Sequence, residues 1–426
     1  MKKAVLLLGM VTLIAGCICL KNADMNTVLY HQRIQQGAQY ADSYPAEYTE
    51  EISSVEEMEE TNEEAQTVSQ DLSQIEEENP VQQVVCDDIT GVIYEKLTQN
   101  EQKIYAEILD SLLSYEEETP LSTTDSKLID KAFTCVMLDH PEIFYVDGYK
   151  YTEYMSGDTV EEIVFAGNYM YDREEIKRRQ NVIDKKVANI LDNTPDTEDE
   201  YLKVKFVYDT LVQQTEYDTG SADNQNICSV FLNGKSVCQG YAKALQYLLN
   251  ELGIKCSLVL GTVTNGEGHA WNLVSVNGAW YYLDATWGDA FYLFGEQEQA
   301  AVADTNLINY DYLCATTRQM MMTHTPDMPV EMPDCTAVVD NYYVREGLYF
   351  TGFDEEKLAS VFGNAATNGQ ETVTIKCSDG TVYDEMCRIL LDEQKIFDFV
   401  ATEGTVAYTD NEEQGSLTFW LFEGRY

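Results

Sequence analysis

Three side chains that together can carry out acyl chemistry occur within one part of the chain: Cys238, His269 and Asp284. A thiol attacks an acyl carbon, imidazole takes the thiol proton and later gives it to the leaving amine, and a carboxylate fixes the imidazole tautomer. Any one of the eleven cysteines is more often a small buried hydrophobe than a nucleophile. The hypothesis therefore depends on whether the chain brings a base to Cys238.

Cys238 comes directly before a helical pattern. Because the N-terminus of a helix carries positive partial charge, a cysteine there favours the thiolate over the thiol. Gly253 stands where a left-handed residue commonly ends a helix. Between the two, apolar residues recur at helical spacing: Tyr241, Ala244, Leu245, Leu248, Leu249 and Leu252.

A predicted hairpin brings the other two residues together. Asn277-Gly278 favours a two-residue turn between strands, which places Asp284 opposite Trp271. His269 lies on the face of Trp271 because strand side chains alternate. His269 and Asp284 are then diagonal neighbours, roughly 7–8 Å apart at the backbone, which suits an imidazole Nδ1–H reaching a carboxylate. Polar pairs are also common on sheet surfaces, so this pair alone does not decide the function.

Three segments around these residues resemble the core of the transglutaminase-like superfamily. They are Gly-Lys-Ser-Val-Cys-Gln-Gly-Tyr-Ala at 234–242, Gly-His-Ala-Trp-Asn at 268–272 and Tyr-Leu-Asp-Ala-Thr-Trp-Gly-Asp at 282–289. The resemblance covers about residues 195–330. It implies an α+β, papain-like core in which a Cys-bearing helix packs on an antiparallel sheet bearing His and Asp. It also implies transamidation, hydrolysis or deamidation of amides by Cys238, His269 and Asp284, with no cofactor and no metal.

The group that would stabilise the developing oxyanion is only partly defined. The Cys238 backbone N–H is expected to be one donor, whereas the second donor stays open between the Gln239 side chain, an indole and a group before the helix. Trp271 and Trp287 suit packing as well as catalysis. His324 is interpreted as a loop residue because Thr and Pro surround it.

The N-terminus predicts export and lipidation. Residues 1–16 have two lysines followed by an apolar run that is too short to span a membrane, which is typical of a signal peptide. Leu-Ile-Ala-Gly-Cys at 13–17 resembles a bacterial lipobox, which implies cleavage before Cys17 and diacylglyceryl attachment to its sulfur. We therefore expect a lipid anchor on the extracytoplasmic face of the cell membrane. Segments 139–144 and 310–313 resemble those of exported proteins of this kind from Gram-positive bacteria, which implies a Gram-positive-like cell. The alternative is a secreted protein in which Cys17 is incidental.

Charge and cysteine spacing restrict the partners. The formal net charge of −47 disfavours nucleic acid and favours basic or lysine-bearing partners, although solubility alone also explains it. Residues 17–89 are rich in acidic and polar residues and predict a disordered tether. The sequence contains no Cys-x-x-Cys pair, so a zinc site or a thioredoxin-like motif has no support. Nine cysteines remain besides Cys17 and Cys238, so a complete disulfide framework is not expected.

We expect three folded parts: an N-terminal α+β module at 90–192, the transglutaminase-like core at 193–334 and a C-terminal α+β module at 335–426. In the C-terminal module, the patterns predict strands at 338–350, 373–377 and 417–422, helices at 355–362 and 383–391, and a turn at Asp379-Gly380. Neither flanking module shows recognisable chemistry. The sequence gives no indication of the oligomeric state.

Two hypotheses about function remain. The first is an envelope-anchored peptidase or transamidase whose substrates are exported proteins or peptides. The alternative is a catalytically silent surface module that keeps this fold for binding or scaffolding. Degenerate members usually lose one of the three site residues, and this chain keeps all of them.

Overall fold

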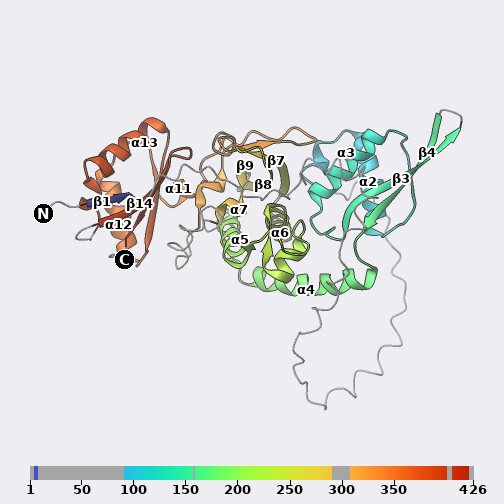
Figure 1. Ribbon diagram of the computed structural model, residues 1–426, viewed down its shortest axis with the longest axis horizontal. Helices are drawn as coiled ribbons and strands as arrows, with labels where there is room; N and C mark the ends of the chain where they lie inside the picture. Colours follow the sequence, from blue (N-terminus) through green and yellow to red (C-terminus); the bar gives the residue numbers. More distant parts are fainter. Residues whose placement is uncertain (1–3, 8–90, 157–158, 290–307, 401–404, 422–426) are drawn as a thin grey trace, which may run out of the picture.

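The computed structural model describes residues 4–7, 91–156, 159–289, 308–400 and 405–421, and Cys17 and the expected tether at 17–89 lie outside them. The three larger sheets are arranged along the molecule in Figure 1, with the core sheet between the N-terminal and C-terminal sheets. No helix in the described ranges is long and apolar enough to cross a membrane. All eight cysteines in these ranges are free.

The N-terminal module consists of helices packed on a small antiparallel sheet of order β2-β4-β3. Helix α2 begins with a capping box, because Thr98 and Glu101 accept from each other's backbone N–H groups. The elements are η2 (Tyr94–Lys96), α2 (Gln99–Leu113), β2 (Thr119–Leu121), α3 (Ser126–Asp139), β3 (Val146–Ser156) and β4 (Thr159–Tyr169).

Helix α4 (Arg173–Asp192) connects this module to the core. It buries only Ile183 and Val187, and both side chains join the hydrophobic cluster formed by α5 and α6. In Figure 1, α4 lies along the same side of the molecule as α5 and α6. The cluster around α2 and α3 likewise includes Ala242 and Leu258 of the core, so the two parts share buried surface.

The core is a five-stranded antiparallel sheet, order β10-β9-β8-β7-β11, with α6 packed on it, which confirms the predicted α+β, papain-like arrangement. Its helices are α5 (Glu200–Gln214), a π-helix (Ser229–Asn233), α6 (Cys238–Glu251), α7 (Ala285–Gly288), η4 (Tyr310–Tyr312) and α10 (Thr317–Met320). The strands of the sheet are β7 (Cys256–Val263), β8 (Gly268–Val276), β9 (Ala279–Leu283), β10 (Leu313–Ala315) and β11 (His324–Pro326). Two further strands, β5 (Glu216–Tyr217) and β6 (Lys235–Ser236), form a separate parallel pair.

The hairpin of β8 and β9 has the predicted register. Asn277 and Gly278 have φ of 49° and 83°, as a two-residue turn requires, and Asn272 pairs with Leu283 at the far end. The Asn277 side chain donates to Asp199 Oδ1 and Asp340 Oδ1, each at 3.1 Å. The turn is therefore bonded to the start of α5 and to the segment that leads into the C-terminal module.

The C-terminal module is a five-stranded mixed sheet, order β1-β14-β15-β13-β12. Its elements are α11 (Tyr342–Arg345), β12 (Tyr349–Phe350), α12 (Glu355–Thr367), β13 (Thr372–Cys377), α13 (Gly380–Cys387), a π-helix (Arg388–Asp392), η6 (Lys395–Asp398), β14 (Thr405–Asn411) and β15 (Ser416–Trp420). Strand β1 (Ala4–Leu7) lies within the expected signal peptide and pairs in parallel with β14. Cleavage before Cys17 would remove it.

Two predictions for this module are wrong. The expected strand at 338–350 instead contains the short helix α11 with turns on both sides, and only Tyr349–Phe350 is a strand. Asn341 caps α11 by accepting from Tyr343 N, so the local cap outweighs the β-branched residues around it. The expected turn at Asp379-Gly380 is instead the start of α13, because Asp379 accepts from the N–H groups of Thr381 and Val382.

Candidate active site

Cys238 is the first residue of α6, at an end that no side chain caps. The preceding residue is Val237, which has no side-chain acceptor for the helix N–H groups. Within the described residues, Gly240 and Tyr241 are the first of the helix whose N–H groups bond back to Val237 O. The N–H groups of Cys238 and Gln239 are therefore available to an anionic ligand beside the half-buried sulfur.

The start of α6 is held by close packing at Gly240. A Cβ at this position would lie 1.9 Å from Ser236 Oγ and 2.9 Å from Ser229 Oγ. These two hydroxyls are hydrogen-bonded at 2.6 Å, and Ser236 also donates to Asn224 O. Only glycine lets this pair of buried serines approach the helix so closely, and their contact fixes the place where Cys238 begins it.

His269 lies on β8 and is almost fully buried. Its Nε2 lies 2.7 Å from Asp284 Oδ2, and its ring also interacts with the Cys238 side chain. Since a carboxylate only accepts, Nε2 carries the hydrogen, which leaves Nδ1 as the nitrogen available to the sulfur. The expectation that Nδ1–H reaches the carboxylate is wrong, because Nε2 is the nitrogen bonded to Asp284.

Asp284 does not continue β9 but caps the next helix. The ladder ends with Leu283, and Asp284 Oδ1 accepts from Thr286 N at 2.9 Å and Trp287 N at 3.1 Å. Its other oxygen is thereby free to face His269. The backbone of Asp284 is held as well, because its carbonyl accepts from the Tyr208 hydroxyl at 3.0 Å.

A second histidine completes the surroundings of the carboxylate. His324 Nε2 lies 3.1 Å from Asp284 Oδ2, and its Nδ1 lies 2.8 Å from Thr323 Oγ1. The interpretation of His324 as a loop residue is wrong, because it begins β11, which pairs with β7 opposite Val263. Its ring lies among the site's aromatic residues, with ring centroids 4.9 Å from Trp271 and 4.8 Å from Trp287. A three-residue strand paired with a distant one leaves no periodic signal in the sequence.

The charges of these groups are coupled. Burial alone would raise the pKa of Asp284, but the charge of His269 and the bonds from both imidazoles hold it well below its usual range. Burial alone would lower the pKa of His269, yet Asp284 and the Cys238 sulfur raise it above its ordinary value. Burial and the positive charge of His269 lower the pKa of His324. The site therefore favours an imidazolium at His269 and a neutral ring at His324.

The same three side chains form a group that could hold a cation. One atom each of His269, Asp284 and His324 lie within 4.8 Å of one another, and all three residues are buried. The two Nε2 hydrogens are already directed at Asp284 Oδ2, so a metal ion would have to replace both protons. The three side chains can therefore support proton transfer as they stand. They could bind a metal ion only after both imidazoles lost their Nε2 protons.

The tryptophans expected either to pack or to assist catalysis are both buried. Trp287 is in ring contact with His269 at 5.8 Å, and Trp271 stacks on the same ring at 6.1 Å. The indole N–H of Trp271 has no hydrogen-bond partner in the described part of the chain. Both rings therefore enclose His269 and restrict its contact with water.

Part of the chain is similar to known proteins. Residues 187–285 match the family model described as Transglutaminase-like superfamily, so the chain carries a transglutaminase-like domain. Human kyphoscoliosis peptidase is 24% identical over 201 residues, which cover 42% of this chain and 30% of that protein. This chain thus matches less than a third of its curated relative's length.

Two solved structures are also similar in part. A crystal structure of a TGase shares 15% identity, covering 33% of this chain and 44% of that one with a TM-score of 0.24. The periplasmic domain of TgpA from Pseudomonas aeruginosa shares 14% identity, covering 34% of this chain and 57% of that one with a TM-score of 0.21. In both cases the overlap is about a third of this chain.

Proposed function

We propose that this chain with a transglutaminase-like domain is a thiol-dependent acyl-transfer enzyme that acts on protein or peptide amides. Cys238 is the nucleophile, His269 the general base and acid, and Asp284 the residue that orients His269. The observation that carries the proposal is that His269 Nε2 is bonded to Asp284 while the same ring interacts with the Cys238 side chain. The thiol, the imidazole and the carboxylate therefore follow one another in the order that proton transfer requires.

The reaction begins with attack of the Cys238 sulfur on the amide carbon, while His269 holds the thiol proton. The carbonyl oxygen becomes an oxyanion beside the free N–H groups of Cys238 and Gln239. When the C–N bond breaks, His269 gives its proton to the leaving amine and an acyl thioester remains on Cys238. Water or a second amine then attacks the thioester, and His269 takes one proton from it and returns it to the sulfur.

The acceptor decides the type of reaction. If the thioester comes from a backbone amide, attack by water completes hydrolysis of the peptide bond. If it comes from a glutamine side chain, attack by water gives deamidation. Attack by an amine gives transamidation. The negative charge of the chain favours amine-bearing substrates by long-range attraction. We further propose that the enzyme is lipid-anchored at Cys17 and meets its substrates on the extracytoplasmic face of the membrane in a Gram-positive-like cell envelope.

The test is a mass-spectrometric screen of peptides with and without a primary amine, with Cys238→Ala as the matched control. Peptide fragments, a gain of about 1 Da from replacement of an amide nitrogen, and amine adducts distinguish the three reactions. We expect at least one of these products with the native chain and none with Cys238→Ala. A chain that binds envelope proteins equally well with and without the thiol, and yields no product, would instead be the scaffold of the alternative hypothesis.

A further inference from the structure

A continuous path of hydrogen bonds leads from the C-terminal module to Asp284. We call it the relay, and it consists of six side chains in this order: Lys376, Gln414, Tyr312, Thr323, His324 and Asp284. The first two residues belong to the C-terminal module, at β13 and at the turn between β14 and β15. The other four belong to the core. All six are buried.

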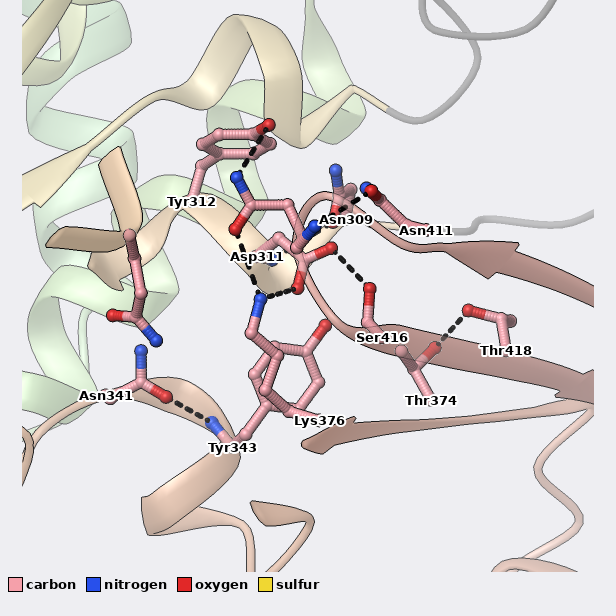
Figure 2. A network of polar contacts seen from close by, with 12 residues as sticks. Asn309, Asp311, Tyr312, Asn341, Tyr343, Thr374, Lys376, Asn411, Ser416 and Thr418 are labelled. Carbon is pink, nitrogen blue, oxygen red and sulfur yellow. Dashed lines mark hydrogen bonds and ion pairs between the residues drawn. The ribbon is translucent and has the colours of Figure 1, made fainter. Parts of the chain in front are cut away.

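The first half of the relay crosses between the two modules. Lys376 Nζ lies 3.2 Å from Gln414 Oε1, and Gln414 Nε2 lies 3.4 Å from the Tyr312 hydroxyl. Figure 2 shows Lys376 and Tyr312 at the two ends of this step. The Tyr312 hydroxyl then lies 3.5 Å from Thr323 Oγ1. The Tyr312 ring meets Trp287 edge-on at 5.1 Å, so it is packed directly against the site.

The chemistry of the end groups gives every link the same direction. Asp284 only accepts, so His324 donates from Nε2 and, as a neutral ring, accepts at Nδ1. Thr323 therefore donates to His324 and accepts from Tyr312. Lys376 only donates, so at the other end Gln414 accepts through Oε1 and donates through its amide. Hydrogen bonds aligned in one direction polarise one another, and here all of them favour negative charge on Asp284.

The module end of the relay is fixed by a buried ion pair. Lys376 Nζ lies 2.8 Å from Asp311 Oδ1, and both residues are at most 4% exposed. Ser416 donates to the other oxygen of Asp311 at 2.8 Å, as Figure 2 also shows. Asp311 directly precedes Tyr312, so β13 and β15 together hold the backbone from which Tyr312 reaches Thr323. The Lys376–Asp311 pair must stay together because leaving either charge buried and unpaired would strongly destabilise the fold.

We propose that the C-terminal module positions the acyl-transfer site: through the relay it holds the His324 ring, and His324 holds the Asp284 carboxylate in line with His269. The inference rests on the proposed function. None of Lys376, Gln414, Tyr312 or His324 is assigned a contact with substrate. They act through Asp284, which becomes a carboxylate held by two imidazoles and two backbone N–H groups.

The test compares Tyr312→Phe and Gln414→Leu with Thr374→Val in the full chain. Tyr312→Phe removes only the hydroxyl and keeps the ring contacts. Thr374→Val is the matched control, because Thr374 bonds Thr418 at 2.8 Å in the same sheet but lies outside the relay. Thr323→Val interrupts the relay within the core, and it replaces Gln414→Leu in the test if that variant does not fold. Far-ultraviolet circular dichroism verifies folding of each variant.

Two measurements are made on each variant. The chain has four histidines, so a spectrum of protein labelled with ¹⁵N-histidine is simple enough to assign. We expect Tyr312→Phe and Gln414→Leu to shift the Nδ1 resonance of His324 and the Nε2 resonance of His269, whereas Thr374→Val leaves both in place. On an active peptide we expect kcat to fall about 3- to 10-fold with KM unchanged, as for loss of one neutral hydrogen bond.

The outcomes separate this inference from the proposed function. Histidine resonances and turnover that stay as in the Thr374→Val control would overturn the relay while leaving a Cys238-dependent enzyme intact. A native chain without any Cys238-dependent product would overturn the proposed function. In that case the histidine spectra still judge the hydrogen-bonded positioning of Asp284: coupled shifts support it and unchanged resonances refute it.

Discussion

His324 and His269 donate to the same oxygen of Asp284, at 3.1 Å and 2.7 Å, from strands on either side of β7. His269 also interacts with the Cys238 side chain, and His324 connects the carboxylate to Thr323. A single carboxylate oxygen therefore connects the proposed catalytic groups to the rest of the protein.

Replacing His324 by Phe tests this arrangement directly. Phe fills the space among the aromatic rings but removes the donor to Asp284 Oδ2 and the acceptor for Thr323. We expect kcat to fall about 10- to 100-fold, with a smaller effect on KM, because a positioning group supports the transition state through Asp284. Steady-state kinetics on an active peptide measure this. His140→Gln is the control, since His140 lies at the end of α3 outside the site; equal losses in both variants would contradict the role.

Alkylation of Cys238 should be selective and should depend on His269. The raised pKa of His269 means that an imidazolium is present beside the sulfur throughout neutral pH. We expect iodoacetamide to modify Cys238 before the buried cysteines, and His269→Ala to slow this at pH 7 about 10-fold or more. Peptide mapping after timed labelling measures both rates.

The effect of pH on this pair has a defined sign. A raised folded pKa means that the stabilisation by His269 is present below its ordinary value of 6.5 and is lost as pH rises through the folded pKa. The difference in labelling rate between the native chain and His269→Ala should likewise decrease as pH rises through the folded pKa of His269. Identical rates in the native chain and His269→Ala at every pH would exclude the imidazole as the partner of Cys238.

Asp284→Asn should abolish most activity while changing the acid stability. An amide can turn its NH₂ toward His269 and favour the wrong tautomer, so we expect kcat to fall about 10³- to 10⁴-fold, the scale of the same change in a serine protease triad. The lowered pKa of Asp284 gives stability that is present above 3.8 and is lost as pH falls toward the folded value. Urea unfolding at several pH values should therefore show a weaker acid dependence in Asp284→Asn. If the free energy of unfolding depended on acid pH equally in Asp284→Asn and in the native chain, an ion pair between Asp284 and His269 would be contradicted.

Gly240→Ala should destabilise the chain where the nucleophile's helix begins. The added methyl group would overlap Ser236 Oγ, which is itself bonded to Ser229. We expect a loss of about 1–3 kcal/mol in the free energy of unfolding, typical of overpacking. Gly363→Ala in α12 is the matched control, because nothing lies within 4 Å of its added Cβ and helical alanine is favoured over glycine. Thermal unfolding should shift down for the first and slightly up for the second.

Local rules account for the parts of the site that depend on neighbouring residues. The turn at Asn277-Gly278 sets the register that brings His269 to Asp284, and the helix after Cys238 follows from its apolar spacing. His324 depends on pairing with Val263, far away in the chain, through a strand of three residues. No pattern marks so short a strand, and the choice of imidazole nitrogen depends on side-chain packing rather than on strand alternation.

The C-terminal module shows the same limit. Strand β13 and the start of α12 follow from local residue patterns, whereas α11 depends on a cap at Asn341. The relay could not be predicted, since it needs the relative placement of β13, η4 and β11. Lys376 and Gln414 are ordinary polar residues in the sequence, and only their burial distinguishes them.

The bonds of Asn277 have a consequence for the alignment of the hairpin. The turn that sets the hairpin register is held by Asp199 from one side and Asp340 from the other. A hairpin misaligned by one residue would lose its facing pairs and present a different side chain to both acids. These bonds therefore stabilise the correctly aligned hairpin relative to a hairpin shifted by one residue.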